Sequence, residues 1–255
     1  MRRTTVRRTA VAASAISLAL LVSACGADKP ADAAPEGKGK GGAADGSATK
    51  ALSQAELDKL VLAEGDLKNH KVTEPSKAEV ALAKTATSDK AECKPLVDAM
   101  MLKPVGSPAA TTSRKISTLP EKPAKDATTE EKAEAGLAAL GKTVLMSDGL
   151  GSYEGKGAQE ALAGLRTAGE ACAGGFTMTA GSDKTKVTKL APGTYAGGDE
   201  AVAFTVTTDQ DGAVGTSQLV TVRKGNAVVS FFAVSLTGKT EQPKAAIDAQ
   251  LAKLG

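Results

Sequence analysis

The stretch that decides the fold is EAVAFTVTTDQDGAVGTSQLVTVRKGNAVVSFFAVSL, residues 200–236. Val202, Phe204 and Val206 alternate with polar or small residues, the period-two pattern of a strand with one buried face. Asp211-Gly212 and the Gly225-Asn226 pair interrupt the pattern where tight hairpin turns need residues that accept a positive φ. The stretch therefore predicts three antiparallel strands joined by short turns.

The last of these strands, residues 227–236, is apolar on both of its faces. Val228, Phe232 and Val234 fall on one face, and Val229 and Phe231 fall on the other. A sheet covered on one side would leave one of these sets in water. Either a helix covers each face, or one face lines a cleft.

The sequence around the three strands adds further strands and two helices. Residues 175–180 and 185–190 predict another hairpin, and Pro243 begins a terminal helix. A further helix precedes Gly174-Gly175 and ends at Cys172. The apolar stripes of the two helices are formed by Ala158, Leu162, Leu165 and Ala168, and by Ile247, Leu251 and Leu254.

The N-terminal part of the domain predicts three more helices and additional extended segments. Ser53 with Glu56, and Thr128 with Glu131, have the spacing of a capping box. A short helix over residues 94–101 lies between them. Extended segments are expected at residues 71–73, 112–119 and 143–147. The chain is thus expected to be α+β, with an antiparallel sheet of about five to six strands and several packed helices.

The first 25 residues have the organisation of a bacterial lipoprotein signal. Four arginines precede an apolar stretch, residues 9–24, that is too short to span a bilayer stably. VSAC, residues 22–25, resembles a lipobox, so we expect removal of residues 1–24 and attachment of diacylglyceryl and palmitate-type acyl chains to Cys25. An ordinary signal peptide cut near Ala24 is the alternative. The export route, general secretion or twin-arginine, stays open.

Residues 25–50 contain mostly Gly, Ala, Asp, Lys and Pro, and they bury too little apolar surface to fold. We interpret them as a flexible, lipid-anchored linker, and residues 51–255 as a single α+β sensor-like domain. The expected location is the outer, extracytoplasmic face of the cell membrane, where the lipid anchor makes the membrane a partner.

Charge and composition argue against nucleic acid as a partner. The chain has 32 Lys and Arg against 29 Asp and Glu. Removing the signal removes four arginines and no acid, which leaves 28 against 29, a net charge of −1. The chain has no Trp, two Tyr and four Phe, which are too few aromatic side chains to form a surface on which nucleic-acid bases stack.

Two cysteines remain once Cys25 carries lipid. In an oxidising compartment Cys93 and Cys172 are the natural disulfide pair. Closing a loop of that length stabilises a fold by roughly 4–4.5 kcal/mol on the chain-entropy account. Two free thiols are the alternative.

The order of motifs resembles the extracellular sensor domain of actinobacterial Ser/Thr receptor kinases of the PknH type, a domain that also occurs in free lipoproteins. The resemblance covers about residues 51–255, although this chain has one cysteine pair where that family often has two. It implies an α+β domain with a ligand-binding cleft and no catalysis. The motifs are a helix at 52–62, ECKPL at 92–96, a helix at 158–166 running into Cys172, GDEAVAF at 198–204, the strands 219–229 with Gly225-Asn226, and a C-terminal helix.

The sequence offers no combination of residues that predicts catalysis, a cofactor or a metal site. His70 is the single histidine, which excludes a histidine-based triad or a multi-histidine metal site, and we expect it to be solvated. Asp209 and Asp211 begin like a calcium loop, but the spacing fails and indicates a hairpin turn. Ser47 and Lys50 have S-x-x-K spacing inside the linker, where no pocket would hold them.

Three classes of function follow from these observations. The first, which the sequence favours, is a non-catalytic binding or sensing domain for a small-molecule, lipid or peptide ligand. The second is a structural or interaction module for a cell-wall or membrane protein. The third is an enzyme that uses Ser and Lys or paired carboxylates from distant segments.

Overall fold

The computed structural model describes residues 50–119, 124, 126–210, 212–235 and 237–255. The predicted signal peptide, Cys25 and the linker up to residue 49 lie outside the described residues. The described chain from Lys50 to Gly255 belongs to one compact unit.

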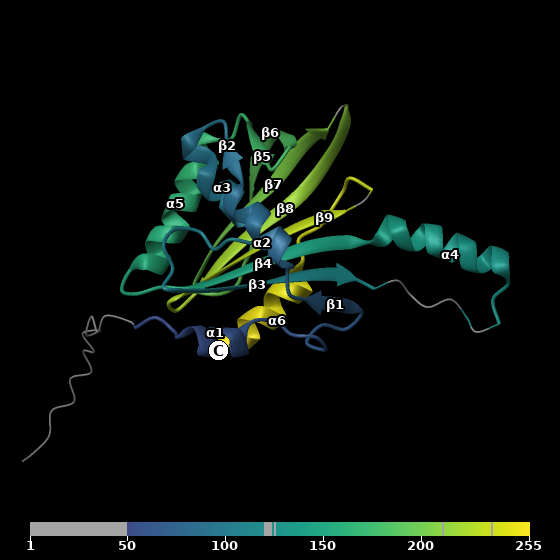
Figure 1. Ribbon diagram of the computed structural model, residues 1–255, viewed down its shortest axis with the longest axis horizontal. Coiled ribbons are helices and arrows are strands. Elements are labelled where there is room, and N and C mark those ends of the chain that lie inside the picture. Colours follow the sequence, from purple (N-terminus) through teal and green to yellow (C-terminus); the bar gives the residue numbers. More distant parts are fainter. Residues whose placement is uncertain (1–49, 120–123, 125, 211, 236) are drawn as a thin grey trace, which may run out of the picture. The chain divides into compact units, whose positions relative to one another are not determined.

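The described residues contain one antiparallel sheet of nine strands, in the order β1-β3-β4-β9-β8-β7-β6-β5-β2 (Figure 1). The expected count of five to six strands is wrong. The edge strands have four and two residues, too few for an alternating pattern to be recognised. The strands are β1 His70–Thr73, β2 Thr87–Ser88, β3 Ala110–Thr118, β4 Val144–Ser152, β5 Phe176–Ala180, β6 Asp183–Gly193, β7 Glu200–Gln210, β8 Ala213–Lys224 and β9 Ala227–Ser235.

The three strands predicted for residues 200–236 are confirmed as β7, β8 and β9. Gly212 and Gly225 stand in their turns with φ of 89° and 59°, which an L-residue rarely adopts. β4 then pairs with the free side of β9, over Val144↔Ser235 to Ser152↔Ala227. This pairing joins the N-terminal strands to the C-terminal hairpins in one sheet.

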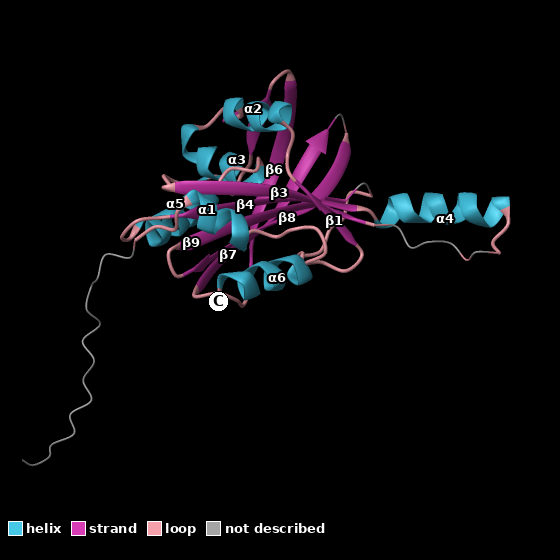
Figure 2. Ribbon diagram, turned by 60° about the horizontal axis from the view of Figure 1, so that its bottom comes forward, coloured by secondary structure: helices cyan, strands magenta, loops and turns pink. Residues whose placement is uncertain are grey.

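Six α-helices and one short 3₁₀ helix occur in the part of the chain that the structure describes (Figure 2). The expected capping boxes are present at Ser53 and Thr128. A third capping box, at Ser76, begins a helix that sequence reasoning missed. The helices are α1 Gln54–Leu60, α2 Lys77–Thr85, η1 Ala91–Cys93, α3 Lys94–Met100, α4 Thr129–Lys142, α5 Gly157–Ala171 and α6 Lys244–Leu254.

Each face of the sheet carries its own apolar core. The disulfide face, named for Cys93 and Cys172, packs α3 and α5 against strand side chains such as Phe204, Leu219 and Val228. The termini face packs α1 and α6 against the opposite set, including Phe231. Together the two cores explain why β9 is apolar on both sides.

Helices thus cover both faces of β9 over most of its length. This agrees with the first of the two alternatives for this strand, a helix on each face. Coverage weakens toward its C-terminal end, where Phe232 and Val234 stay half-buried on the disulfide face. An apolar groove lies there, so the second alternative holds for this end of the strand.

Helix α2 shows that the sheet curls around the disulfide face. It links β1 and β2, the two edge strands, through 13 residues between Thr73 and Thr87. In a flat sheet eight inter-strand steps of about 4.8 Å would separate these edges by roughly 38 Å. A nine-residue helix with four extended residues spans only about 27 Å. The sheet therefore bends toward α2.

Candidate functional site

The candidate site lies at the free edge of β3. β1 pairs with β3 only from His70↔Thr118 to Thr73↔Lys115. Pro75 lies two residues after the end of β1, and it has no N–H that could continue the hydrogen bonding between β1 and β3. The β3 backbone from Thr111 to Ser113 therefore has no strand partner on this side.

Parity determines which peptide groups face the open edge. The Leu119 N–H donates to the Asn69 carbonyl, so odd-numbered residues of β3 present their backbone groups toward β1. Thr111 and Ser113 have the same parity. Their N–H and C=O groups consequently point out of the sheet edge.

Gln54 of α1 occupies the place of a neighbouring strand beside Thr111. Its Nε2 donates to the Thr111 carbonyl at 2.9 Å, and the Thr111 N–H donates to its Oε1 at 3.3 Å. Nε2 also donates to Asp58 Oδ1 at 2.9 Å, which fixes the amide orientation. A side chain thus satisfies one peptide of the edge. At the next outward-facing residue, Arg114 donates to the Ser113 carbonyl, and the Ser113 N–H faces the cleft without a strand partner.

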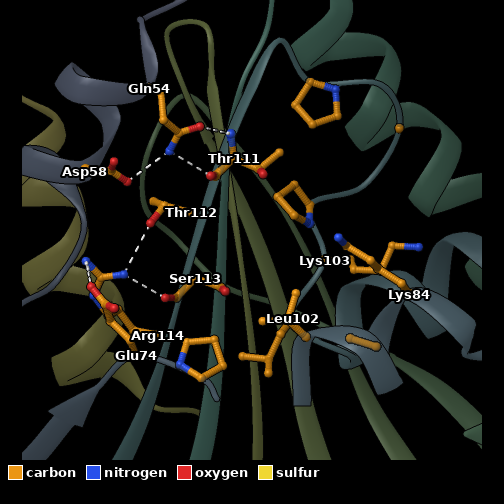
Figure 3. Close-up of a pocket in the computed structure, with 16 residues that line it drawn as sticks. Gln54, Asp58, Glu74, Lys84, Leu102, Lys103, Thr111, Thr112, Ser113 and Arg114 are labelled. Carbon is orange, nitrogen blue, oxygen red and sulfur yellow. Dashed lines mark hydrogen bonds and ion pairs between the residues drawn. The ribbon is translucent and has the colours of Figure 1, made fainter. Parts of the chain in front are cut away.

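A cleft of about 840 Å³ surrounds this edge; we call it the edge cleft (Figure 3). Its walls come from α1, α2, β3 and the loop that follows α3. It is lined by Gln54, Asp58, Glu74, Pro75, Val80, Ala83, Lys84, Leu102, Lys103, Pro104, Gly106, Pro108 and residues 111–114.

Arg114 is the most confined cation of the edge cleft. Its guanidinium donates to Thr112 Oγ1 at 3.2 Å and to the Ser113 carbonyl at 2.8 Å. Its ion pair with Glu74 is long, at 3.8 Å, and Glu74 itself is 80% exposed. The guanidinium therefore keeps capacity for an anionic partner in the cleft.

Asp148 of β4 lies directly opposite Arg114 in the sheet register and is fully buried. Phe231 flanks it on the other side, in the termini-face core. Neither carboxylate oxygen has a hydrogen-bond partner among the described residues. Burial raises the pKa of Asp148 to about 8, against the opposing charge of Arg114. The side chain is thus a neutral acid at neutral pH.

Two lysines line the wall opposite Arg114. Lys103 pairs with Asp98 at 2.6 Å, and Asp98 also binds Lys94 at 2.7 Å. Lys84, at the end of α2, forms no ion pair with any residue that the structure describes. Lys84 is thus the cation of the edge cleft with no acid attached.

The residues singled out from sequence lie elsewhere. Cys93 and Cys172 are fully buried with their Cα atoms 5.8 Å apart, in an arrangement compatible with the predicted disulfide. His70 begins β1 and is half-buried, with Nδ1 2.7 Å from the Lys68 carbonyl oxygen. Asp209 accepts the Gly212 N–H at 2.8 Å, which is a turn contact.

The edge cleft was missed by sequence reasoning, since its polar residues lie in segments that were interpreted only as strand, helix or loop. Arg114 and Asp148 each interrupt a strand-forming stretch, and a charged residue there is the signal that could have identified them. In the described ranges no three His, Cys, Asp or Glu side chains gather as a metal site. No helix of those ranges is both long and apolar enough to cross a membrane.

Comparison with known proteins finds similar chains among solved structures. No protein-family model and no curated protein matches the chain. Among solved structures, the chain is similar to the extracellular domain of PknH from Mycobacterium tuberculosis, with 13% identity over 80% of this chain and 95% of that chain. The TM-score is 0.43. A match at this level establishes neither a shared fold nor a shared function.

Proposed function

We propose that the chain is a non-catalytic extracytoplasmic domain that binds a ligand in the edge cleft. The lipid on Cys25 holds it at the outer face of the cell membrane. The observation that carries the proposal is the cleft itself, where apolar side chains and three cations line the open edge of β3. Binding sites are typically concave and mostly apolar, with a few oriented polar groups.

The polar groups of the cleft favour binding over catalysis. The Thr112 hydroxyl accepts a hydrogen bond from Arg114, whose guanidinium cannot serve as a base. Asp148, the acid with a strongly raised pKa, lies fully buried beneath the sheet surface. These groups can orient a ligand, whereas nucleophilic chemistry needs a hydroxyl paired with a base.

A native mass spectrum of the protein purified from its own membrane tests the proposal. We expect a co-purifying species that Lys84→Gln depletes several-fold. Lys132→Gln is the matched control, because Lys132 is also an exposed helical lysine but lies on α4, away from the cleft. Equal retention by both variants, or no co-purifying species at all, would contradict the proposal.

A second candidate, an interaction module for a membrane or cell-wall protein, is favoured by α4. No residue of this helix is buried, and Leu137 and Leu140 are 71% and 56% exposed. Two leucines one turn apart on an open helix face are a typical docking feature.

Photo-crosslinking in cells tests this second candidate. A photoreactive residue in place of Leu137 should trap one specific protein, and the same residue in place of Lys132 should trap it less. Recovery of only random neighbours from both positions would eliminate the candidate.

A further inference from the structure

Helix α2 lies over the disulfide face of the sheet as a weakly held strap. Ala83 is its only buried residue among those described, and Leu82 is 39% exposed. The strap is tied to β3 by the Glu79–Lys115 ion pair at 2.5 Å. At its other side the Leu82 side chain contacts the turn at Gly181, between β5 and β6.

An apolar groove of about 270 Å³ lies beneath the strap. Its floor is the half-covered end of β9, with Phe232 and Val234, together with Leu145 of β4, which is 42% exposed. Met100 and Met101 form its end wall, and methionines adapt readily to irregular apolar ligands. The groove has the lining that an alkyl chain requires.

The groove and the edge cleft adjoin each other. Ala83 of the strap and Leu102 of the loop after α3 line both spaces. On the cleft side of this junction lie Lys84 and Lys103, whereas Arg114 and its partner Glu74 line the cleft on the other side of β3 (Figure 3). A molecule that filled both spaces would therefore meet apolar carbon at one end and cations at the other.

Leu102 at the junction has a strained backbone. Its φ is +60°, and Asn69 is the only other non-glycine residue with a positive φ among those described. Asparagine tolerates this conformation, whereas leucine adopts it only with steric strain. The chain keeps a large apolar side chain where glycine would be relaxed, which indicates a role for that side chain at the junction.

We infer that the ligand is a lipid with an anionic headgroup, held with its alkyl chain beneath α2 and its headgroup beside Lys84 and Lys103. This inference rests on the proposed function and specifies its ligand class. Arg and Lys recognise phosphate and carboxylate groups through charge-assisted hydrogen bonds. Burial of each methylene of an alkyl chain is favourable as well, so chain and headgroup both contribute to affinity.

Three probes separate the parts of such a ligand. The protein, purified from its own membrane in a non-ionic detergent, is titrated with dodecyl phosphate, dodecan-1-ol or inorganic phosphate, and adducts are counted by native mass spectrometry. We expect dodecyl phosphate to bind at least ten-fold more tightly than either partial probe. Equal binding of dodecan-1-ol or of inorganic phosphate would overturn the inference, because then one part of the molecule suffices.

The junction offers a variant that separates binding from folding. Leu102→Gly relieves the positive φ and removes the shared side chain, so stability should stay equal or rise while dodecyl phosphate binding falls several-fold. Asn69→Gly is the matched control at the other positive φ and should leave binding unchanged. Equal binding by Leu102→Gly and the unaltered protein would overturn the inference.

The outcomes distinguish this inference from the function on which it rests. A co-purifying species that depends on Lys84, combined with no selective dodecyl phosphate binding, would reject the lipid and leave the edge cleft as a binding site. Absence of both the co-purifying species and the adduct would reject both.

Discussion

The two faces of the sheet hold their helices by different means. On the disulfide face, Cys93 at the start of α3 and Cys172 at the end of α5 meet. On the termini face the Gln250 side chain of α6 joins the end of α1, accepting from the Leu62 N–H at 3.0 Å and donating to the Leu60 carbonyl at 2.8 Å. The first tie depends on redox conditions, and the second depends only on hydrogen bonds.

The buried polar side chains differ between the faces as well. Thr221 and Ser230 lie on the disulfide face and bond each other at 2.9 Å. Asp148 lies on the termini face and has no such partner. The comparison teaches that the buried polar pair of the disulfide face has no group that titrates near neutral pH, whereas the termini face contains a buried acid that does.

The largest expected effect is on the disulfide face. Replacing both cysteines, Cys93→Ala with Cys172→Ala, should lower the free energy of unfolding by about 4.5 kcal/mol, because the 79-residue separation no longer restricts the unfolded chain. Urea unfolding with and without reductant measures it. If thiol titration of the denatured, unreduced protein finds two free thiols, the bond is absent and the comparison fails.

Next comes the pH dependence of the termini face. The pKa of Asp148 is raised from 3.8 to about 8, so the unfolded chain loses this proton before the folded chain does. Stability therefore falls as pH rises between these values, by at most about 1.4 kcal/mol per pH unit. Asp148→Asn should flatten this slope. Urea unfolding at pH 5, 6, 7 and 8 tests it, and parallel profiles would show that Asp148 does not titrate in this range.

A matched pair of glycines in α5 probes the packing of the disulfide face. A Cβ at Gly169 would lie 2.2 Å from the Phe204 ring, whereas a Cβ at Gly164 would meet nothing within 4 Å. Gly169→Ala should cost about 1–3 kcal/mol through overpacking, and Gly164→Ala should add about 0.5–1 kcal/mol through helix propensity. Thermal unfolding measures both, and changes of the same sign would contradict the packing described.

The smallest effect is expected in α4, which contributes to neither face. Leu137→Ser should change the free energy of unfolding by less than about 0.5 kcal/mol, since the side chain is mainly exposed. Leu162→Ala, in the buried stripe of α5, is the comparison and should cost about 2–5 kcal/mol. A large loss from Leu137→Ser would mean that α4 packs against the fold.

The sequence predicted secondary structure best where the pattern was local. The alternation from Val202 to Val206 and the capping boxes at Ser53 and Thr128 all correspond to observed elements. The strand expected at 143–147 continues to Ser152, because β4 receives partners on both sides that stabilise the glycine-containing end. Helix α2 was missed because its apolar residues are mostly alanine, which marks no clear stripe, and the Ser76–Glu79 capping spacing was overlooked.

The candidate site was not predicted, and its residues show why. Gln54 and Thr111 are 57 positions apart, and Arg114 and Asp148 are 34 positions apart. None forms a motif, since their relation exists only through strand register and the docking of α1. Ala83 and Leu102 likewise line two neighbouring spaces only because the sheet curls beneath α2.

The sequence by itself determined the α+β class, the central hairpins and the position of most helices, because periodicity and turn residues act within a few positions of the chain. It also supplied the predictions of export, lipid attachment and cysteine pairing. Tertiary structure alone decided that the strands form one curled sheet and that β3 keeps an open edge. Both depend on pairing between distant segments, where the free energy of burial and hydrogen bonding is shared among residues that no local pattern connects.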